Sequence, residues 1–170
     1  ASVRKSLLAM LTGIAEGSQY AFTWTGPYGG GKSCAALLVA NLVAGNKKQR
    51  ALAEGIVGPE LVKEFSSAFP GRGRAWDVLA VTGRRTGLTG ALAEAAAAQF
   101  EWPRATLERA GDERVLIDEL EGHARHKGGL LVVVDELGKF LEHATSSSGD
   151  VHILQDLAER AARSNGRLVV

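Results

Sequence analysis

The chain has 170 residues, of which 45% are hydrophobic and 23% are charged, and its formal net charge is +1. These proportions are ordinary for a globular domain; they exclude an intrinsically disordered chain and give no support to nucleic-acid binding. The length suits one domain with a sizeable core, spanning residues 1–170.

The cysteine count and the apolar stretches bear on where the protein works. Cys34 is the single cysteine, so no disulfide can form within the chain and nothing indicates an oxidising compartment. The longest apolar stretch, about residues 35–44, is too short to span a bilayer, and no signal peptide is recognisable. We expect a cytoplasmic protein without a membrane partner. The chain has no initiator methionine and ends in RLVV, which reads as the beginning of a strand, so we expect a fragment of a longer protein.

In chain order, segments of helical spacing alternate with short apolar runs. Helices are predicted at 2–16, at 33–44, from Pro59 onward, at 87–99 and at 152–164, with one or two more within 103–126. Strands are predicted at 20–25, 75–81, 130–134 and 168–170. This alternation predicts right-handed βαβ crossovers and an α/β fold, a three-layer α/β/α sandwich with a mainly parallel sheet.

The stretch GPYGGGKS, from Gly26 to Ser33, satisfies the pattern G-x-x-x-x-G-K-[ST] at every fixed position. Glycines let the backbone adopt positive φ and turn its N–H groups inward, which makes a concave anion site. Lys32 supplies a positive charge for the β- and γ-phosphates, and the Ser33 hydroxyl is a Mg²⁺ ligand. The helix that begins near Lys32 adds the positive end of its dipole. A strand before the loop and a helix after it are the context that this motif requires.

We therefore predict that the loop binds the phosphates of ATP. The predicted binding residues are Gly26, Pro27, Tyr28, Gly29, Gly30, Gly31, Lys32, Ser33 and Cys34. Tyr28 either leans on the nucleotide or shapes the loop. Cys34 contributes a backbone N–H near the phosphates, and we expect its thiol to be packed rather than reactive.

A phosphate-binding loop also needs a carboxylate at the end of another strand. Two places offer aliphatic residues followed by Asp-Glu: VLIDE at 115–119 and LLVVVDE at 130–136. The first has three aliphatic residues and continues into a helix-like segment, so its carboxylates are expected on a solvated helical face. The second has five consecutive aliphatic residues after two glycines, which is typical of a strand buried on both faces of a parallel sheet.

We favour the second place. Asp135 is then the magnesium carboxylate, together with Ser33, and Glu136 is the general base that polarises a water for attack on the γ-phosphate. Glu136 and Lys32 are thus the predicted catalytic residues. The alternative is that the Asp-Glu pair only caps the turn that follows the strand.

These residues resemble the additional-strand ATPase division of P-loop NTPases, which includes AAA+ and STAND proteins. The resemblance rests on GPYGGGKS and LLVVVDE, and the order of elements extends it over most of the chain. It implies that a further strand lies between the P-loop strand and the Asp-Glu strand, for which RLVV is the candidate. The stretch VVVDELGKFLEHA, followed by LQDLAERAAR, also looks like large ATP-binding proteins of bacterial anti-phage defence systems.

Rival P-loop families lack their own signatures here. The N-K-x-D motif of GTPases would need an aspartate where Gln49 stands, and residues 88–91 do not form the LSGGQ-like signature of ABC ATPases. No arginine-rich lid of a small-molecule kinase is apparent. Four arginines are candidate γ-phosphate ligands, and none is assigned that role: Arg84, Arg85, Arg160 and Arg163.

The expected function is Mg²⁺-dependent binding and hydrolysis of ATP by a module that drives a conformational change in a larger bacterial protein or complex. One alternative is a nucleotide-binding switch or scaffold that turns over slowly or not at all; a small-molecule kinase is less favoured. Protein partners or a self-oligomer are expected.

Overall fold

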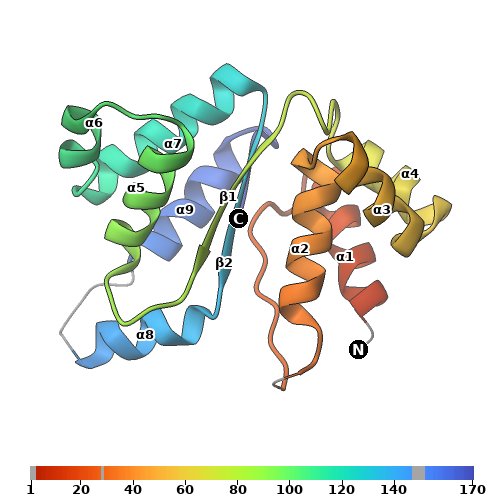
Figure 1. The fold of residues 1–170 in the computed structure, drawn as a ribbon, viewed down its shortest axis with the longest axis horizontal. Helices are drawn as coiled ribbons and strands as arrows, with labels where there is room; N and C mark the ends of the chain where they lie inside the picture. The colour runs from red at the N-terminus through yellow and green to blue at the C-terminus, as the bar shows by residue number, and fades with distance from the viewer. Residues whose placement is uncertain (1–2, 28, 147–151) are drawn as a thin grey trace.

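The computed structural model describes residues 3–27, 29–146 and 152–170 (Figure 1). Within these ranges the chain forms nine helices and three short strands. In chain order they are α1 (Val3–Ala15), α2 (Lys32–Ala44), α3 (Lys47–Val57), α4 (Pro59–Ala68), β1 (Asp77–Thr82), α5 (Leu88–Gln99), α6 (Arg104–Arg109), α7 (Glu113–Lys127), β2 (Leu130–Asp135), α8 (Leu137–Ser146), α9 (His152–Arg163) and β3 (Leu168–Val169). The predicted α/β class is confirmed.

The three strands form one parallel sheet in the order β1-β2-β3. Along the pair β1 and β2, Asp77 lies opposite Leu130 and Thr82 lies opposite Asp135. Leu130 also lies opposite Leu168 of β3. Because the strands are parallel, their carboxyl ends meet at one edge of the sheet, which is where open α/β sheets bind ligands.

The segment before the glycine-rich loop is not a regular strand, so the prediction of a strand at 20–25 is wrong. It does make two backbone hydrogen bonds with the residue after β3: Phe22 donates to Val170 at 2.9 Å, and Val170 donates to Tyr20 at 2.9 Å. This is the pattern of a parallel pair. From Thr23 to Thr25 no backbone hydrogen bond is formed with any described residue, so the pairing stops there. The chain around β3 thus lies between residues 20–22 and β2.

Helices cover both faces of the sheet. In Figure 1, α5, α6, α7 and α9 lie on one side of the strands, and α1 to α4 lie on the other. Side chains of β2 alternate between the two cores, because Leu130 and Val132 pack on the first side and Leu131 and Val133 on the second. The predicted burial of this strand on both faces is therefore confirmed over its first half, and its last three residues are half-buried.

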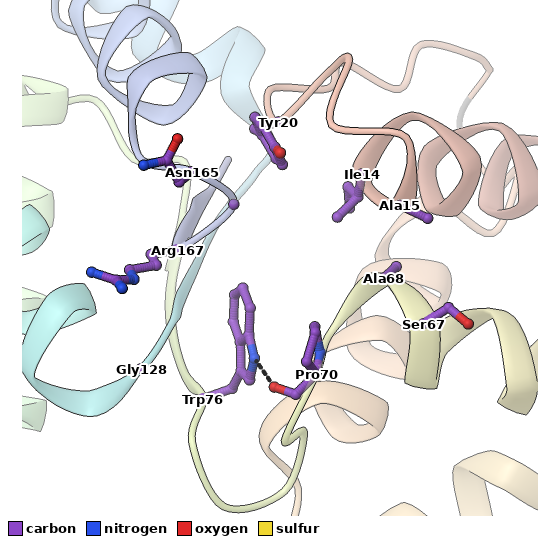
Figure 2. Close-up of a pocket in the computed structure, with 11 residues that line it drawn as sticks. Ile14, Ala15, Tyr20, Ser67, Ala68, Pro70, Trp76, Gly128, Asn165 and Arg167 are labelled. Carbon is purple, nitrogen blue, oxygen red and sulfur yellow. Dashed lines mark hydrogen bonds between the residues drawn. The ribbon is translucent and has the colours of Figure 1, made fainter.

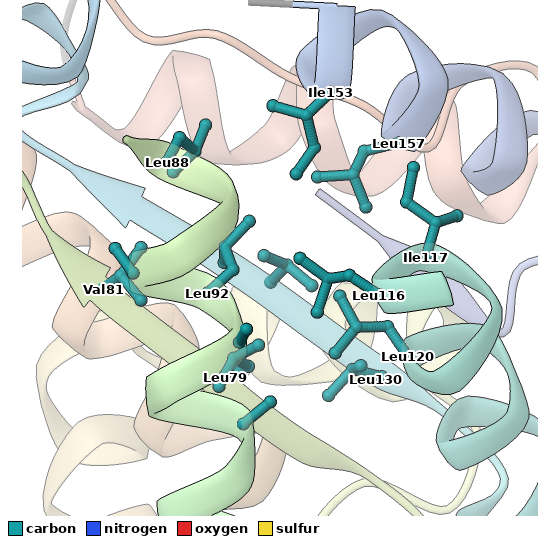
Figure 3. Packing of buried hydrophobic residues seen from close by; sticks show 14 of the residues in the cluster. Leu79, Val81, Leu88, Leu92, Leu116, Ile117, Leu120, Leu130, Ile153 and Leu157 are labelled. Atoms are coloured by element: carbon teal, nitrogen blue, oxygen red, sulfur yellow. The ribbon is translucent and has the colours of Figure 1, made fainter. Parts of the chain in front are cut away.

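The first core is built from leucines at helical spacing. Figure 3 shows Leu92 of α5, Leu116 of α7 and Leu157 of α9 in one cluster with Leu130 of the sheet. All four side chains are fully buried. Burial of each such side chain contributes about 1.5–3 kcal/mol, so this contact fixes the strands against their helices.

No described helix has the length and the apolar character that crossing a bilayer requires.

Candidate functional site

The glycine-rich loop leads directly into α2, as its sequence predicts. Gly29 and Gly31 have φ angles of 74° and 77°, in the left-handed region that glycine adopts without strain. Gly31 is the residue before the helix, and α2 starts at Lys32. Tyr28 lies outside the described residues. The predicted use of glycine, to give positive φ in this loop, is therefore found at two positions.

Lys32 folds back over its own loop. Its Nζ donates hydrogen bonds to the carbonyl oxygens of Gly26 and Pro27, each at 2.8 Å. An ammonium group has three donors, so two of them are committed to the loop backbone. A phosphate bound in this loop would have to take over at least part of this coordination.

Backbone donors at the start of α2 have no partner in the part of the chain that the structure describes. Within residues 3–27, 29–146 and 152–170, the N–H groups of Lys32, Ser33 and Cys34 have no hydrogen-bond acceptor, and no side chain caps the helix. Ser33 is exposed. Unsatisfied N–H groups and the helix dipole together attract anions.

The cysteine is exposed, which corrects the expectation that its thiol is packed. The reason lies in the helix periodicity, because Ala35, Val39 and Leu42 form the buried face of α2 and Cys34 lies outside it.

The Asp-Glu pair forms a tight turn between β2 and α8. Asp135 is half-buried, and its Oδ1 accepts a hydrogen bond of 2.9 Å from the backbone N–H of Glu136. The Glu136 backbone has a φ of 52°, and its carboxylate forms an ion pair with Lys139 at 2.5 Å. One oxygen of Asp135 therefore caps the turn, as the alternative interpretation of this pair predicts, and its other oxygen has no partner among the residues described.

The loop and the Asp-Glu turn lie at the same edge of the sheet. Residues 20–22 and β2 run in the same direction, and each is followed at its carboxyl end by one of the two features. In Figure 1 the loop before α2 and the start of α8 both lie at the lower end of the view. Strand alternation also places Asp135 on the side of Leu131 and Val133, which is the side of α2.

No side-chain hydrogen bond or ion pair joins the described residues of the loop to the Asp-Glu turn. In the described part of the chain, the side-chain hydrogen bonds of Lys32 stay within its own loop, and those of Glu136 stay within its own turn. No group of three or more His, Cys, Asp or Glu that could hold a metal by itself occurs among the described residues.

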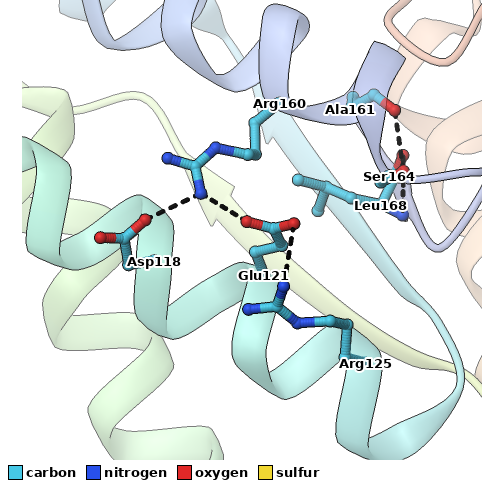
Figure 4. A network of polar contacts seen from close by, with 7 residues as sticks. All are labelled: Asp118, Glu121, Arg125, Arg160, Ala161, Ser164 and Leu168. Atoms are coloured by element: carbon cyan, nitrogen blue, oxygen red, sulfur yellow. Dashed lines mark hydrogen bonds and ion pairs between the residues drawn. The ribbon is translucent and has the colours of Figure 1, made fainter.

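Three of the four arginines weighed from the sequence are held in ion pairs. Arg84 pairs with Glu94, and Arg163 pairs with Glu159. Arg160 of α9 pairs with two carboxylates of α7, which Figure 4 shows. Arg85 is exposed and has no ion pair with any described residue.

The α7 carboxylates affect the titration of Arg160. Its hydrogen bond to Glu121 is the largest contribution that raises the pKa of the guanidinium above its ordinary value, and Asp118 acts in the same direction, against partial desolvation. Arg160 is thus a structural link between two helices.

A pocket that the sequence did not indicate lies at the opposite edge of the sheet. It has a volume of about 320 Å³ and includes Trp76, Gly128 and Arg167, the residues just before or near the starts of the three strands (Figure 2). Tyr20 and the end of α1 also line it. The pocket lies at the amino ends of the strands, whereas the glycine-rich loop lies at the edge formed by their carboxyl ends. This pocket is therefore separate from the candidate phosphate site.

Comparison with family models, curated proteins and solved structures finds no match for this chain. A function must therefore be argued from the loop, the order of the strands and the Asp135–Glu136 turn.

Proposed function

We propose that this chain is the nucleotide-binding module of an ATPase, which binds ATP with Mg²⁺ and hydrolyses it. The observation that carries the proposal is the loop itself. Within the motif GPYGGGKS, Gly29 and Gly31 are left-handed, and Gly31 leads into the N-terminus of α2, where no side chain of the described residues forms a cap. Such a loop directs backbone donors, a helix dipole and the Lys32 ammonium at one anion.

The order of the strands supports the same proposal. Counted across the sheet, the neighbouring segments are residues 20–22, β3, β2 and β1, in that order. One strand therefore separates the segment before the loop from the strand that ends in Asp135. That is the arrangement implied by the resemblance to the additional-strand ATPase division.

The residues present fit a magnesium ion held mainly by its substrate. Mg²⁺ prefers oxygen ligands and is usually bound by one or two protein groups, with phosphate oxygens and waters completing the octahedron. Ser33 offers an exposed hydroxyl, and Asp135 offers a half-buried carboxylate on the side of the sheet that faces α2. We assign these two residues to the metal. When bound, Mg²⁺ would neutralise charge on the phosphates.

Lys32 and Glu136 then have separate roles, in phosphate binding and in activation of water. Lys32 exchanges its bonds to the loop carbonyls for bonds to the β- and γ-phosphates. Glu136 leaves its ion pair with Lys139, accepts a proton from a water molecule and orients that water toward the γ-phosphate. Both side chains are thus held by local partners that a bound nucleotide must displace.

A second candidate is a nucleotide-binding switch that hydrolyses ATP slowly or not at all. The ion pair between Glu136 and Lys139 favours it, because it occupies an oxygen of the carboxylate that would act as the base. In either case we place the module in a larger protein or complex, where nucleotide binding changes its conformation.

Two measurements on the purified chain test these proposals: equilibrium binding of ATP and release of inorganic phosphate, both with Mg²⁺. The ATPase proposal predicts that Glu136→Gln still binds ATP and loses phosphate release, whereas Lys32→Ala binds ATP roughly 10- to 100-fold more weakly. Binding without phosphate release in the wild-type protein would favour the switch. No binding of ATP at any accessible concentration would refute both candidates.

A further inference from the structure

The end of β1 lies directly against the Asp-Glu turn. The register of the two strands brings Thr82 opposite Asp135, and Gly83 extends the pairing by one residue, because its N–H donates to the carbonyl oxygen of Asp135 at 2.8 Å. Gly83, the first residue after β1, therefore lies beside Glu136.

No side chain fits at Gly83. A Cβ built there would lie 2.1 Å from the carbonyl oxygen of Glu136, 2.9 Å from its carbonyl carbon and 3.1 Å from its Cβ. Two of these three atoms are backbone, which cannot rotate away as the end of a flexible side chain can. Any residue other than glycine at position 83 must therefore push the Glu136 backbone out of its place.

Glu136 is held in a conformation that it does not adopt by preference. Its φ of 52° lies in the left-handed region, which costs a non-glycine residue about 1–2 kcal/mol. Such backbone persists only where the surroundings fix it, and it is concentrated at functional sites. Two contacts fix it here: the Asp135 carboxylate accepts the Glu136 N–H, and the Gly83 backbone packs against the Glu136 carbonyl.

We propose that Gly83 is a positioning residue for Glu136. Without a side chain at Gly83, the end of β1 can lie so close to Glu136 that the Glu136 backbone is held left-handed. This backbone conformation sets the direction in which the Glu136 carboxylate projects from the turn. The inference rests on the proposed catalytic role of Glu136. It adds that the geometry of the base is determined by a residue on a different strand, more than fifty positions earlier in the chain.

The test compares Gly83→Ala with Gly138→Ala in the full chain. Gly138 lies two positions after Glu136, at the start of α8, and a Cβ there meets nothing within 4 Å, so it is a matched control. For each variant the dissociation constant for ATP and the kcat for phosphate release are measured with Mg²⁺. We expect Gly83→Ala to keep the affinity for ATP and to lose roughly 10- to 100-fold in kcat, since a displacement of about 1 Å can cost that much. Gly138→Ala is expected to match the wild-type protein in both.

The outcomes separate this inference from the proposed function. If the wild-type protein releases phosphate and Gly83→Ala does so at the same kcat, the positioning role is refuted while the ATPase stands. If Gly83→Ala loses ATP binding together with turnover, Gly83 serves the fold in general, and the positioning role is again refuted. If the wild-type protein releases no phosphate, the catalytic role of Glu136 fails, and this inference fails with it.

Discussion

Lys32 donates a hydrogen bond of 2.8 Å to the carbonyl oxygen of Gly26, six residues earlier in the same loop. The ammonium group therefore lies against the backbone of its own loop, and its hydrogen-bond partners among the described residues are carbonyl oxygens. Carbonyl oxygens are weaker partners for an ammonium than phosphate oxygens, because a charged acceptor makes a stronger hydrogen bond. Under the proposed function, a phosphate of ATP would therefore replace the carbonyl oxygens as the partner of Lys32.

Replacing this ammonium should weaken nucleotide binding without unfolding the protein. We expect Lys32→Ala to bind ATP roughly 10- to 100-fold more weakly, since hydrogen bonds to charged groups contribute about 1.5–3 kcal/mol. Lys63→Ala, which removes an exposed lysine from α4, is the control and should bind as the wild-type protein does. Calorimetric titration with ATP measures both. Equal affinity of Lys32→Ala and the wild-type protein would contradict the assignment of this loop.

The ion pair of Glu136 with Lys139 gives a second prediction. Because the pair engages the Glu136 carboxylate through Oε2, removing the lysine charge should free the base for water. We expect Lys139→Ala to raise kcat for phosphate release about twofold to tenfold, the range of one modest ion pair, and to leave ATP affinity unchanged. A lower kcat in Lys139→Ala would show that the lysine assists the reaction instead of restraining it.

Much of the fold follows from local patterns in the sequence. The run LLVVV predicts 130–134 as a strand, and β2 is Leu130–Asp135. The first Asp-Glu stretch, at 115–119, is correctly predicted as helical, since it lies in α7 and follows an Asp112 cap. These features depend on residues close in sequence, which is why periodicity is sufficient to find them.

The features that the sequence did not predict correctly have identifiable physical causes. Residues 20–25 alternate as a strand should, yet they pair only where Val170 reaches them, because a strand exists only as far as its neighbour extends. Helix α3 was not predicted, although Asn46 and Gln49 form a capping box that marks its start. The approach of Gly83 to Glu136 has no local signal, since it arises from the register between two strands.

Gly129 gives a prediction about stability. A Cβ at Gly129 would lie 2.4 Å from the ring of Trp76, which is only 5% exposed and packs edge-to-face on Phe69 at 4.9 Å. Gly129→Ala should therefore destabilise the protein by about 1–3 kcal/mol, as overpacking does. Gly122→Ala, in the middle of α7 with nothing within 4 Å of the new Cβ, should stabilise it by about 0.5–1 kcal/mol. Urea unfolding followed by circular dichroism measures both changes, and equal effects of the two variants would contradict the packing described.

Arg160 gives the last prediction, because it joins α9 to Asp118 and Glu121 of α7 (Figure 4). Its side chain is 33% exposed and that of Glu121 is 15% exposed, so solvent screens this pair less than a surface one. We expect Arg160→Ala to lower the free energy of unfolding by about 1–2 kcal/mol, and Arg163→Ala, whose pair with Glu159 is more exposed, by less than about 0.5 kcal/mol.

The raised pKa of Arg160 means that its contribution to stability is fully present below the ordinary pKa of arginine and is lost only as the pH rises through the raised value. The difference between Arg160→Ala and the wild-type protein should therefore stay constant between about pH 6 and 9, where the guanidinium remains charged. Urea unfolding at several pH values measures this difference, and a loss no larger than that of Arg163→Ala would show that the link between the two helices does not stabilise the fold.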